Sequence, residues 1–205
     1  MTDTESRRQP IVEAMIRVVG RKGYRAATVA DAIAEAGVSR TTFYRHFADK
    51  HECFLAAYEV AAERALAAVE TECGSERPWL QRVRGGLESL VELLAGDREL
   101  ARALVVESVV AGADARRRQW VTIGRCARLL DAGRERSGPE LPASTGLMAA
   151  SAVTGLLFDE VQAGHTVELP ERLPDLLFAL LVPYLGPWAA AEEMRTAVAQ
   201  ASASR

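Results

Sequence analysis

A short stretch of this 205-residue chain, from Arg40 to Lys50, concentrates side chains that suit contact with a nucleic acid duplex. Arginine fits the edges of guanine, threonine can contact bases or thymine methyl groups, and tyrosine and lysine can bind phosphate oxygens. The stretch is therefore a candidate groove-reading segment. Its polar members are Arg40, Thr41, Thr42, Tyr44, Arg45, His46 and Lys50.

The charge distribution points to the same region. The chain as a whole carries a formal net charge of −3, which by itself argues against a polyanion as partner. Residues 1–50, however, hold nine Lys and Arg against six Asp and Glu, whereas the remainder holds sixteen against twenty-two. A polyanion would thus meet the N-terminal part of the chain. The first ten residues are polar and predict an unstructured arm, in which Arg7 and Arg8 are either minor-groove contacts or part of a solvated tail.

Three short helices are expected to position the groove-reading side chains. Apolar residues recur at helical spacing over residues 11–21 and predict the first helix. Thr28 begins the second helix as an N-cap with Asp31 three residues on, and Gly37 ends it. Ser39 caps the third. The second and third helices, joined by a turn that glycine can make without steric cost, form a helix-turn-helix. In this motif the second helix enters the major groove.

The inner side of the helix-turn-helix is expected to form a small apolar core that fixes the angle between its helices. Phe43 and Phe47 lie at positions i and i+4, on one face of the third helix. The polar residues of that helix therefore fall on its opposite, exposed face. The members of the expected core are Val29, Ile33, Val38, Phe43 and Phe47.

The segment TVADAIAEAGVSRTTFYRHFADKHECFLAAYE closely resembles the N-terminal signature of the TetR (tetracycline-repressor) family, and the match covers about residues 10 to 60. It includes the second-helix threonine, the Gly-Val-Ser turn, the Phe-Tyr pair and Lys50. Arg45 departs from the residue that many members carry, which affects the expected base preference. By position, the resemblance implies a DNA-contacting set. The candidate DNA-binding residues are Thr28, Ser39, Arg40, Thr41, Thr42, Tyr44, Arg45, His46 and Lys50.

The same resemblance implies how the rest of the chain works. It implies nine or so helices, a ligand pocket in a C-terminal body, and a homodimer made by the last two long helices. It further implies a transcriptional regulator, expected to be a repressor, that leaves palindromic double-stranded operator DNA when a small, mainly apolar effector binds.

Beyond the helix-turn-helix, periodicity again predicts helices alone. We therefore expect an all-α fold of about nine or ten helices. Residues 1–50 would form a three-helix DNA-binding domain, and residues 51–205 a helical ligand-binding and dimerisation domain. The further helices are expected over residues 49–72, 79–94, 98–110, 120–130, 143–163 and 173–185.

Several aromatic and acidic side chains are candidates for the effector site. Trp79, Trp120 and Phe158 either line a pocket or belong to the core, since their spacing is that of core residues. Asp159, Glu160 and His165 are a possible acid–base cluster, and Asp159 and Glu160 could face a cationic ligand. Alternatively, these residues are solvated or paired. The candidate ligand-binding residues are Trp79, Trp120, Phe158 and Asp159.

The last two long helices have complementary compositions that favour pairing across a two-fold axis. Small residues such as Gly146 and Gly155 allow close approach, and the following helix carries a broad leucine stripe. The candidate dimer-interface residues are Leu173, Leu176, Leu177, Leu180, Leu181 and Tyr184.

Other functional classes have little sequence support. No glycine-rich phosphate loop, GxSxG elbow or metal-spaced His/Cys set is present, so we expect no enzyme, no cofactor and no metal. The apolar run from Leu173 is interrupted by prolines and is shorter than the roughly 20 residues of a bilayer span, so no membrane partner is expected. A helical interaction module that does not bind DNA remains an alternative, against which the polar set of residues 40–50 argues.

Three cysteines, Cys53, Cys73 and Cys126, are widely spaced and predict a reducing cytoplasm rather than disulfides, with a redox role left open. The basic run at residues 116–118 lies on an amphipathic helix without groove-reading neighbours, which favours a solvated face.

Overall fold

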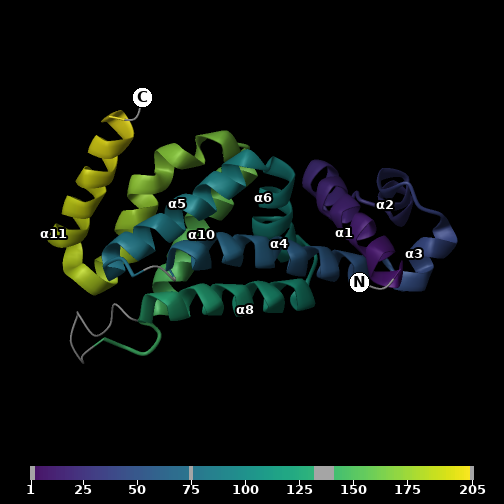
Figure 1. The fold of residues 1–205 in the computed structure, drawn as a ribbon, viewed down its shortest axis with the longest axis horizontal. Helices are drawn as coiled ribbons and strands as arrows, with labels where there is room; N and C mark the ends of the chain where they lie inside the picture. Colours follow the sequence, from purple (N-terminus) through teal and green to yellow (C-terminus); the bar gives the residue numbers. More distant parts are fainter. Residues whose placement is uncertain (1–2, 74–75, 132–140, 204–205) are drawn as a thin grey trace. The chain divides into compact units, whose positions relative to one another are not determined.

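The structure is a computed structural model that describes residues 3–73, 76–131 and 141–203. Within these ranges the chain contains helices and no strand (Figure 1), so the predicted all-α fold is confirmed. The chain forms two compact units. Unit 1 comprises Met1–Arg64 with Asp97–Gln119, and unit 2 comprises Ala65–Gly96 with Trp120–Arg205. These units are defined by packing, and the functional boundary at residue 50 stays a prediction.

Unit 1 is organised around α1, which packs against both α2 and α6. The inner face of α1 is completely buried at Ile11, Met15 and Val19. At Gly20 a Cβ atom would lie 2.4 Å from the Cα atom of Glu99, so only glycine lets α1 approach α6 this closely. The helices of unit 1 are α1 (Asp3–Lys22), α2 (Val29–Ala36), α3 (Arg40–His46), the first part of α4 (Lys50–Cys73), α6 (Arg98–Val105), α7 (Glu107–Val110) and the start of α8 (Ala113–Leu130).

The N-terminal segment differs from its prediction. The expected unstructured arm is part of α1, which begins at Asp3 and includes Pro10. The Arg8 side chain is described, whereas the Arg7 side chain lies outside the described part.

Unit 2 holds the long helices of the second half of the chain. The 3-10 helix η2 packs against α5, and α10 packs against α11. Its core is aliphatic, with Leu94, Leu169, Leu176 and Leu177 almost fully buried. The helices of unit 2 are the second part of α4, α5 (Trp79–Gly96), the rest of α8, α10 (Thr145–Ala163), η2 (Thr166–Arg172) and α11 (Leu173–Ala203).

Helix α8 corrects one expectation about the core. Trp120 was expected to face inward with Ile123, Ala127 and Leu130, but 51% of it is exposed. The buried residues of α8 are Ala115, Ile123, Ala127 and Leu130. They lie on one face of the helix, at a spacing of about four residues, with position 119 between the first two. Trp120 lies one residue further on, about 100° around the helix, and therefore points to solvent.

Helix α11 is longer than predicted and is bent. The helix expected to end near Leu185 continues to Ala203, with a break at Gly186, whose φ of 76° and ψ of 166° are non-helical. Glycine reaches a positive φ without steric cost, and Pro187 can then begin the next helical stretch. Ala190 and Ala197 are the buried residues of this second half.

The leucine stripe on α11, predicted to form the dimer interface, lies mostly inside the chain. Leu176, Leu177, Leu180, Leu181 and Tyr184 are all buried within a single chain, so this chain already covers them. These residues belong to the core of unit 2, and their place in a dimer interface stays a prediction. Leu173 is half-buried.

By length and composition, the stretch Thr166–Val198 is apolar enough to cross a membrane, contrary to the expectation from its prolines. Its inner leucines are buried in unit 2, and Gly186 breaks the helix within it. The core helix of a water-soluble bundle passes the same test.

Candidate nucleic-acid interface

Helix α2 begins with the predicted cap. The Asp31 backbone N–H donates to the Thr28 hydroxyl at 3.1 Å, and the Thr28 N–H donates to the Asp31 carboxylate at 3.0 Å. Lys22 also donates to Asp31, and this bond, followed by those from Thr28, lowers the pKa of Asp31 to about 2. The Thr28 side chain therefore has a structural role as a helix cap, and its DNA contact stays a prediction.

The turn and the start of α3 also follow the expected geometry. Gly37 adopts φ 66° and ψ 31°, the left-handed conformation, and the Val38 N–H donates to the Ile33 carbonyl at 3.3 Å. The Ser39 hydroxyl then accepts from the Thr42 N–H at 3.0 Å and caps α3. Ser39 and Thr42 also share a hydroxyl contact of 2.9 Å.

Two phenylalanines anchor α3 and divide its faces. Phe43 and Phe47 are almost fully buried, with ring centroids 5.8 Å apart. Of the other three residues expected in this core, Val29, Ile33 and Val38 are only half-buried. The aromatic pair therefore forms the centre of the core, and the aliphatic residues form its edge.

The outer face of α3 carries the exposed groove-reading candidates. Arg40, Thr41, Tyr44 and Arg45 are exposed and together line an open hollow of about 560 Å³. The Arg40 guanidinium lies over the Tyr44 ring, 5.5 Å from its centroid. Thr42 and His46 are half-buried at the edge of this face. The structure thus brings four of the predicted residues together on one accessible surface.

Lys50 occupies a different environment from the residues of α3. Its ammonium donates to the carbonyls of Tyr24 and Ala27, at 2.8 Å and 2.9 Å, and lies 4.4 Å from the centre of the Tyr24 ring. An ammonium has three N–H donors, so one donor remains for a phosphate oxygen. The sequence contained no signal for these two backbone bonds.

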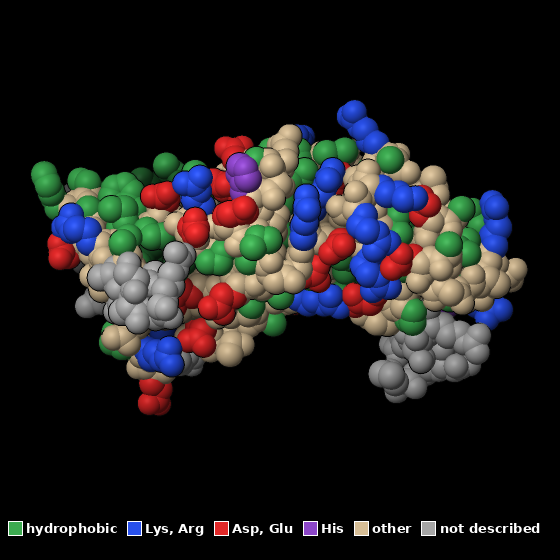
Figure 2. All heavy atoms as spheres, turned by 90° about the horizontal axis from the view of Figure 1, so that it is seen from above, with side chains coloured by type: hydrophobic (Ala, Val, Ile, Leu, Met, Phe, Trp, Pro, Cys, Tyr) green, Lys and Arg blue, Asp and Glu red, His purple; other side chains and the backbone are tan. Residues whose placement is uncertain are grey.

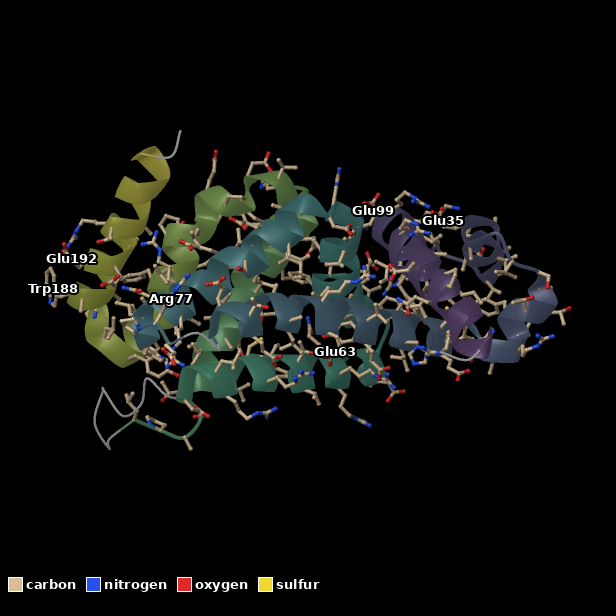
Figure 3. The ribbon with its side chains drawn as sticks, in the orientation of Figure 1. Glu35, Glu63, Arg77, Glu99, Trp188 and Glu192 are labelled. Atoms are coloured by element: carbon tan, nitrogen blue, oxygen red, sulfur yellow. The ribbon has the colours of Figure 1, made fainter. Side chains whose placement is uncertain are left out.

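Helix α2 is tied to α1 through its acidic residues. Glu35, labelled in Figure 3, accepts from Arg17 at 2.7 Å and from Arg21, and these bonds, that from Arg17 first, lower its pKa. Figure 2 shows basic and acidic side chains lying next to one another on the right-hand half of the surface, where Figure 1 places α1, α2 and α3. Since the acidic groups of α2 are paired with α1, they do not offset the basic face of α3. The Arg8 guanidinium lies 5.1 Å from the centre of the Phe47 ring, which places a further cation beside α3.

The four candidate ligand-binding residues do not share one environment. Trp79 is buried, with its ring 5.4 Å from that of Tyr184, whereas Trp120 and Asp159 are exposed and Phe158 is half-buried. Among the residues that the structure describes, no group accepts a hydrogen bond from the Trp79 indole N–H. Trp79 is therefore the candidate with an unused donor in the interior of unit 2.

The acidic and histidine candidates near residue 160 form surface ion pairs. Glu160 lies 3.1 Å from His165 Nδ1 and 2.7 Å from Arg172 Nε, which join the end of α10 to η2. Exposed pairs of this kind contribute little to stability. Burial raises the pKa of Cys53 to about 12, which disfavours its thiolate form, and Cys126 is half-buried. The Cys73 side chain lies outside the described residues.

Comparison with known proteins supports the interpretation of unit 1. Residues 11–57 match the family of bacterial regulatory proteins called tetR. Over these residues, which include α2 and α3, the chain is therefore similar to the tetR family of regulators. No curated protein sequence matches it significantly.

Solved structures of transcriptional regulators share the fold over most of the chain. TylP from Streptomyces fradiae, a TetR regulator, is 25% identical, with a TM-score of 0.69, and the match covers 98% of this chain and 99% of that one. FadR from Bacillus subtilis, solved with stearoyl-CoA, is 16% identical with a TM-score of 0.73, covering 87% and 98%. SmeT, the repressor of a Stenotrophomonas maltophilia multidrug efflux pump, is 21% identical with a TM-score of 0.67, covering 89% and 90%. The TetR-like fold therefore extends through unit 2.

Proposed function

We propose that this regulator is a cytoplasmic repressor that binds palindromic operator DNA as a homodimer and is released by a small, mainly apolar effector. The observation that carries the proposal is the exposed set Arg40, Thr41, Tyr44 and Arg45 on α3, held in place by buried Phe43 and Phe47. In this proposal residues 1–50 bind DNA, and residues 51–205 bind the effector and form the dimer.

The side chains on α3 divide into two roles. Arg40 and Arg45 would read guanine edges, and Thr41 would contact a base or thymine methyl group. Tyr44 would hold a phosphate, as would the free donor of Lys50. The proposal includes Thr28, Ser39, Thr42 and His46 as edge contacts, of which Ser39 and Thr28 also cap helices.

The experiment for DNA binding is selection of bound sequences from a pool of random duplexes, at a fixed and stated salt concentration. Enrichment of a two-fold symmetric site with half-sites about one helical turn apart would support the proposal. Enrichment of no sequence, or of a site without symmetry, would contradict it.

A revised surface supports the proposed dimer. Met148 and Leu156 on α10 are 64% and 40% exposed, and a Cβ atom added to Gly155 between them would meet no atom of this chain within 4 Å. This apolar, small-residue face allows a second helix to approach closely, as the composition of this helix predicted. We therefore propose α10, rather than the inner leucines of α11, as the centre of the dimer interface.

Unit 2 supports the proposed effector through its apolar interior. The buried Trp79 indole would donate to one acceptor atom of a mainly apolar ligand, and Phe158 would add apolar surface. The related FadR structure with stearoyl-CoA concerns a ligand with a long apolar chain. Stearoyl-CoA is thus a reasonable first probe, measured with and without operator. By linkage, operator must weaken effector binding by the factor by which effector weakens DNA binding. Identical ligand affinities in both conditions would show that the ligand is not an inducer.

A further inference from the structure

The segment Gly23–Ala27, which connects α1 to α2, is held from two sides by distant parts of unit 1. On one side Lys50 of α4 donates to its carbonyls. On the other side Glu107, the first residue of α7, accepts from the Tyr24 backbone N–H at 2.7 Å. The connection therefore depends on side chains far along the chain, in addition to its own backbone.

Glu107 is unusual because its carboxylate is buried. Only 3% of the residue is exposed, and its second oxygen accepts from the Arg102 Nε atom at 3.0 Å. Burying a carboxylate is costly unless it is paired and hydrogen-bonded, and Glu107 satisfies that condition with one cation and one backbone amide. This costly burial of a carboxylate occurs where, among the described residues, only Glu107 holds the α1–α2 connection from this side.

Gly23 makes room for this carboxylate. Its φ is +80°, and a Cβ atom added to it would lie 3.3 Å from Glu107 Oε1 and 3.5 Å from an Arg102 nitrogen. A left-handed residue here ends α1, and the absence of a side chain lets the carboxylate approach the Tyr24 amide.

Tyr24 carries the effect to the start of α4. Its ring lies 4.9 Å from the Phe54 ring, and its hydroxyl is 3.1 Å from His51 Nδ1. With Lys50 bound to the Tyr24 carbonyl, the backbone and ring of one residue link α7 to the beginning of α4. Any shift of Tyr24 would therefore move α1, α2 and the start of α4 relative to one another.

We propose that Glu107 is a positioning residue for DNA binding: by fixing the Tyr24 amide it holds the helix-turn-helix in the orientation that two half-sites require. This inference rests on the proposed function, because it assumes that the protein binds a two-half-site operator. Without the carboxylate acceptor the Tyr24 N–H is left unsatisfied, and the connection can tilt. The consequence is relaxed geometry, in addition to weaker binding.

The test is a series of operators in which the spacer between half-sites is shortened or lengthened by one base pair. Each added base pair rotates one half-site by about 35° relative to the other. A dimer whose two helix-turn-helix motifs are held rigidly should therefore bind the altered operator less tightly. We expect the wild type to prefer its own spacing by at least about tenfold. In Glu107→Ala the preference should fall to about twofold and the affinity for the best operator should fall about tenfold, as expected for an orphaned buried amide.

Two further substitutions show whether the hydrogen bond to the Tyr24 amide or the charge of Glu107 sets the spacing preference. They also keep the test valid if Glu107→Ala does not fold. Glu107→Gln keeps a carbonyl acceptor for the Tyr24 amide and should retain the wild-type spacing preference. Glu107→Asp keeps the charge but shortens the side chain by one methylene, so it should behave like Glu107→Ala. If Glu107→Ala does not fold, the comparison of Asp with Gln carries the test alone.

The matched control is Glu99→Ala on α6 (Figure 3), which removes the same charge from the neighbouring helix and keeps the Cβ atom that faces Gly20. It should leave the spacing preference unchanged. A wild-type spacing profile in Glu107→Asp, or a relaxed one in Glu107→Gln or Glu99→Ala, would overturn the positioning role. If the wild type binds no DNA, the proposed function fails and the positioning role fails with it.

Discussion

The helix-turn-helix of unit 1 and the helical body of unit 2 carry their available polar groups in opposite locations. On α3 the arginines, Thr41 and Tyr44 are exposed, and two buried phenylalanines hold the helix in place. In unit 2 the unused polar atoms, Trp79 Nε1 and the Thr166 hydroxyl, are buried, while several large apolar side chains, among them Trp120, Met148 and Trp188, are exposed. Contact with DNA, a polyanion, requires exposed polar side chains, whereas a small enclosed ligand requires polar atoms inside the protein.

The largest expected effect comes from the anchor beneath the reading face. Phe43→Ala should lower the free energy of unfolding of unit 1 by about 3–5 kcal/mol, because it removes a fully buried ring. DNA binding should be lost with it. Tyr44→Ala, one residue further on the exposed face, should change stability by no more than about 0.5 kcal/mol while still weakening DNA binding. The check is denaturant unfolding of both variants followed by circular dichroism, and equal destabilisation would show that the two faces of α3 are not distinct.

The next effect distinguishes the two faces of unit 2. Leu156→Glu on α10 should produce a folded monomer, since a charge at the proposed interface would have no partner there. We expect the dimer dissociation constant to rise at least about a hundredfold. Leu177→Glu on α11 should instead unfold the protein, because that leucine is fully buried within one chain. Sedimentation and circular dichroism distinguish these outcomes, and a Leu156→Glu protein that stays dimeric would place the interface elsewhere.

A smaller effect distinguishes, within the helix-turn-helix region, residues that contact bases from residues that contact the DNA phosphate backbone. Arg40→Ala should cost about 1–3 kcal/mol at particular base pairs and little on random DNA. Lys50→Ala should weaken all sequences alike and reduce the salt slope by about one unit if its third donor binds a phosphate. Titrations on operator and random duplexes at several salt concentrations measure both. Equal losses on the two duplexes for Arg40→Ala would rule out base reading by this residue.

The smallest effect concerns the cap of α2. Because the folded pKa of Asp31 is lowered to about 2, its contribution is present above its ordinary pKa of 3.8 and is lost as pH falls through about 2. The wild type should therefore be slightly more stable than Asp31→Asn at neutral pH, and the two should converge between about pH 4 and pH 2. Thermal unfolding across this range tests the point, and a constant difference down to pH 2 would contradict it.

Local signals made most of unit 1 predictable. The caps at Thr28 and Ser39 and the left-handed Gly37 each depend on residues within a few positions, so the sequence alone indicated α2, α3 and the face of α3 that is exposed. The partners of Lys50 and Glu107 could not be predicted in this way. The Tyr24–Glu107 bond joins residues 83 positions apart, which only the packing of α6 and α7 beside α1 brings together.

In unit 2 the sequence indicated which residues are apolar, but not what covers them. The leucines of α11 have a stripe that suits either a core or a partner, and most of them are buried within the single chain. The predicted inward position of Trp120 was wrong, because this residue lies one position beyond the buried face of α8. The bend at Gly186 coincides with a Gly-Pro pair; the prediction ended the last helix near residue 185, whereas the helix continues beyond the bend.

The bond from the Tyr24 amide to Glu107 has a consequence for hydrogen exchange. Amides in connecting segments usually exchange rapidly, because brief local openings expose them to water. The Tyr24 amide, in contrast, donates to a carboxylate that is itself buried, and it can meet water only when α7 separates from the α1–α2 connection. It should therefore exchange as slowly as the amides of the helices around it, so that a residue between two helices reports the opening of unit 1 as a whole.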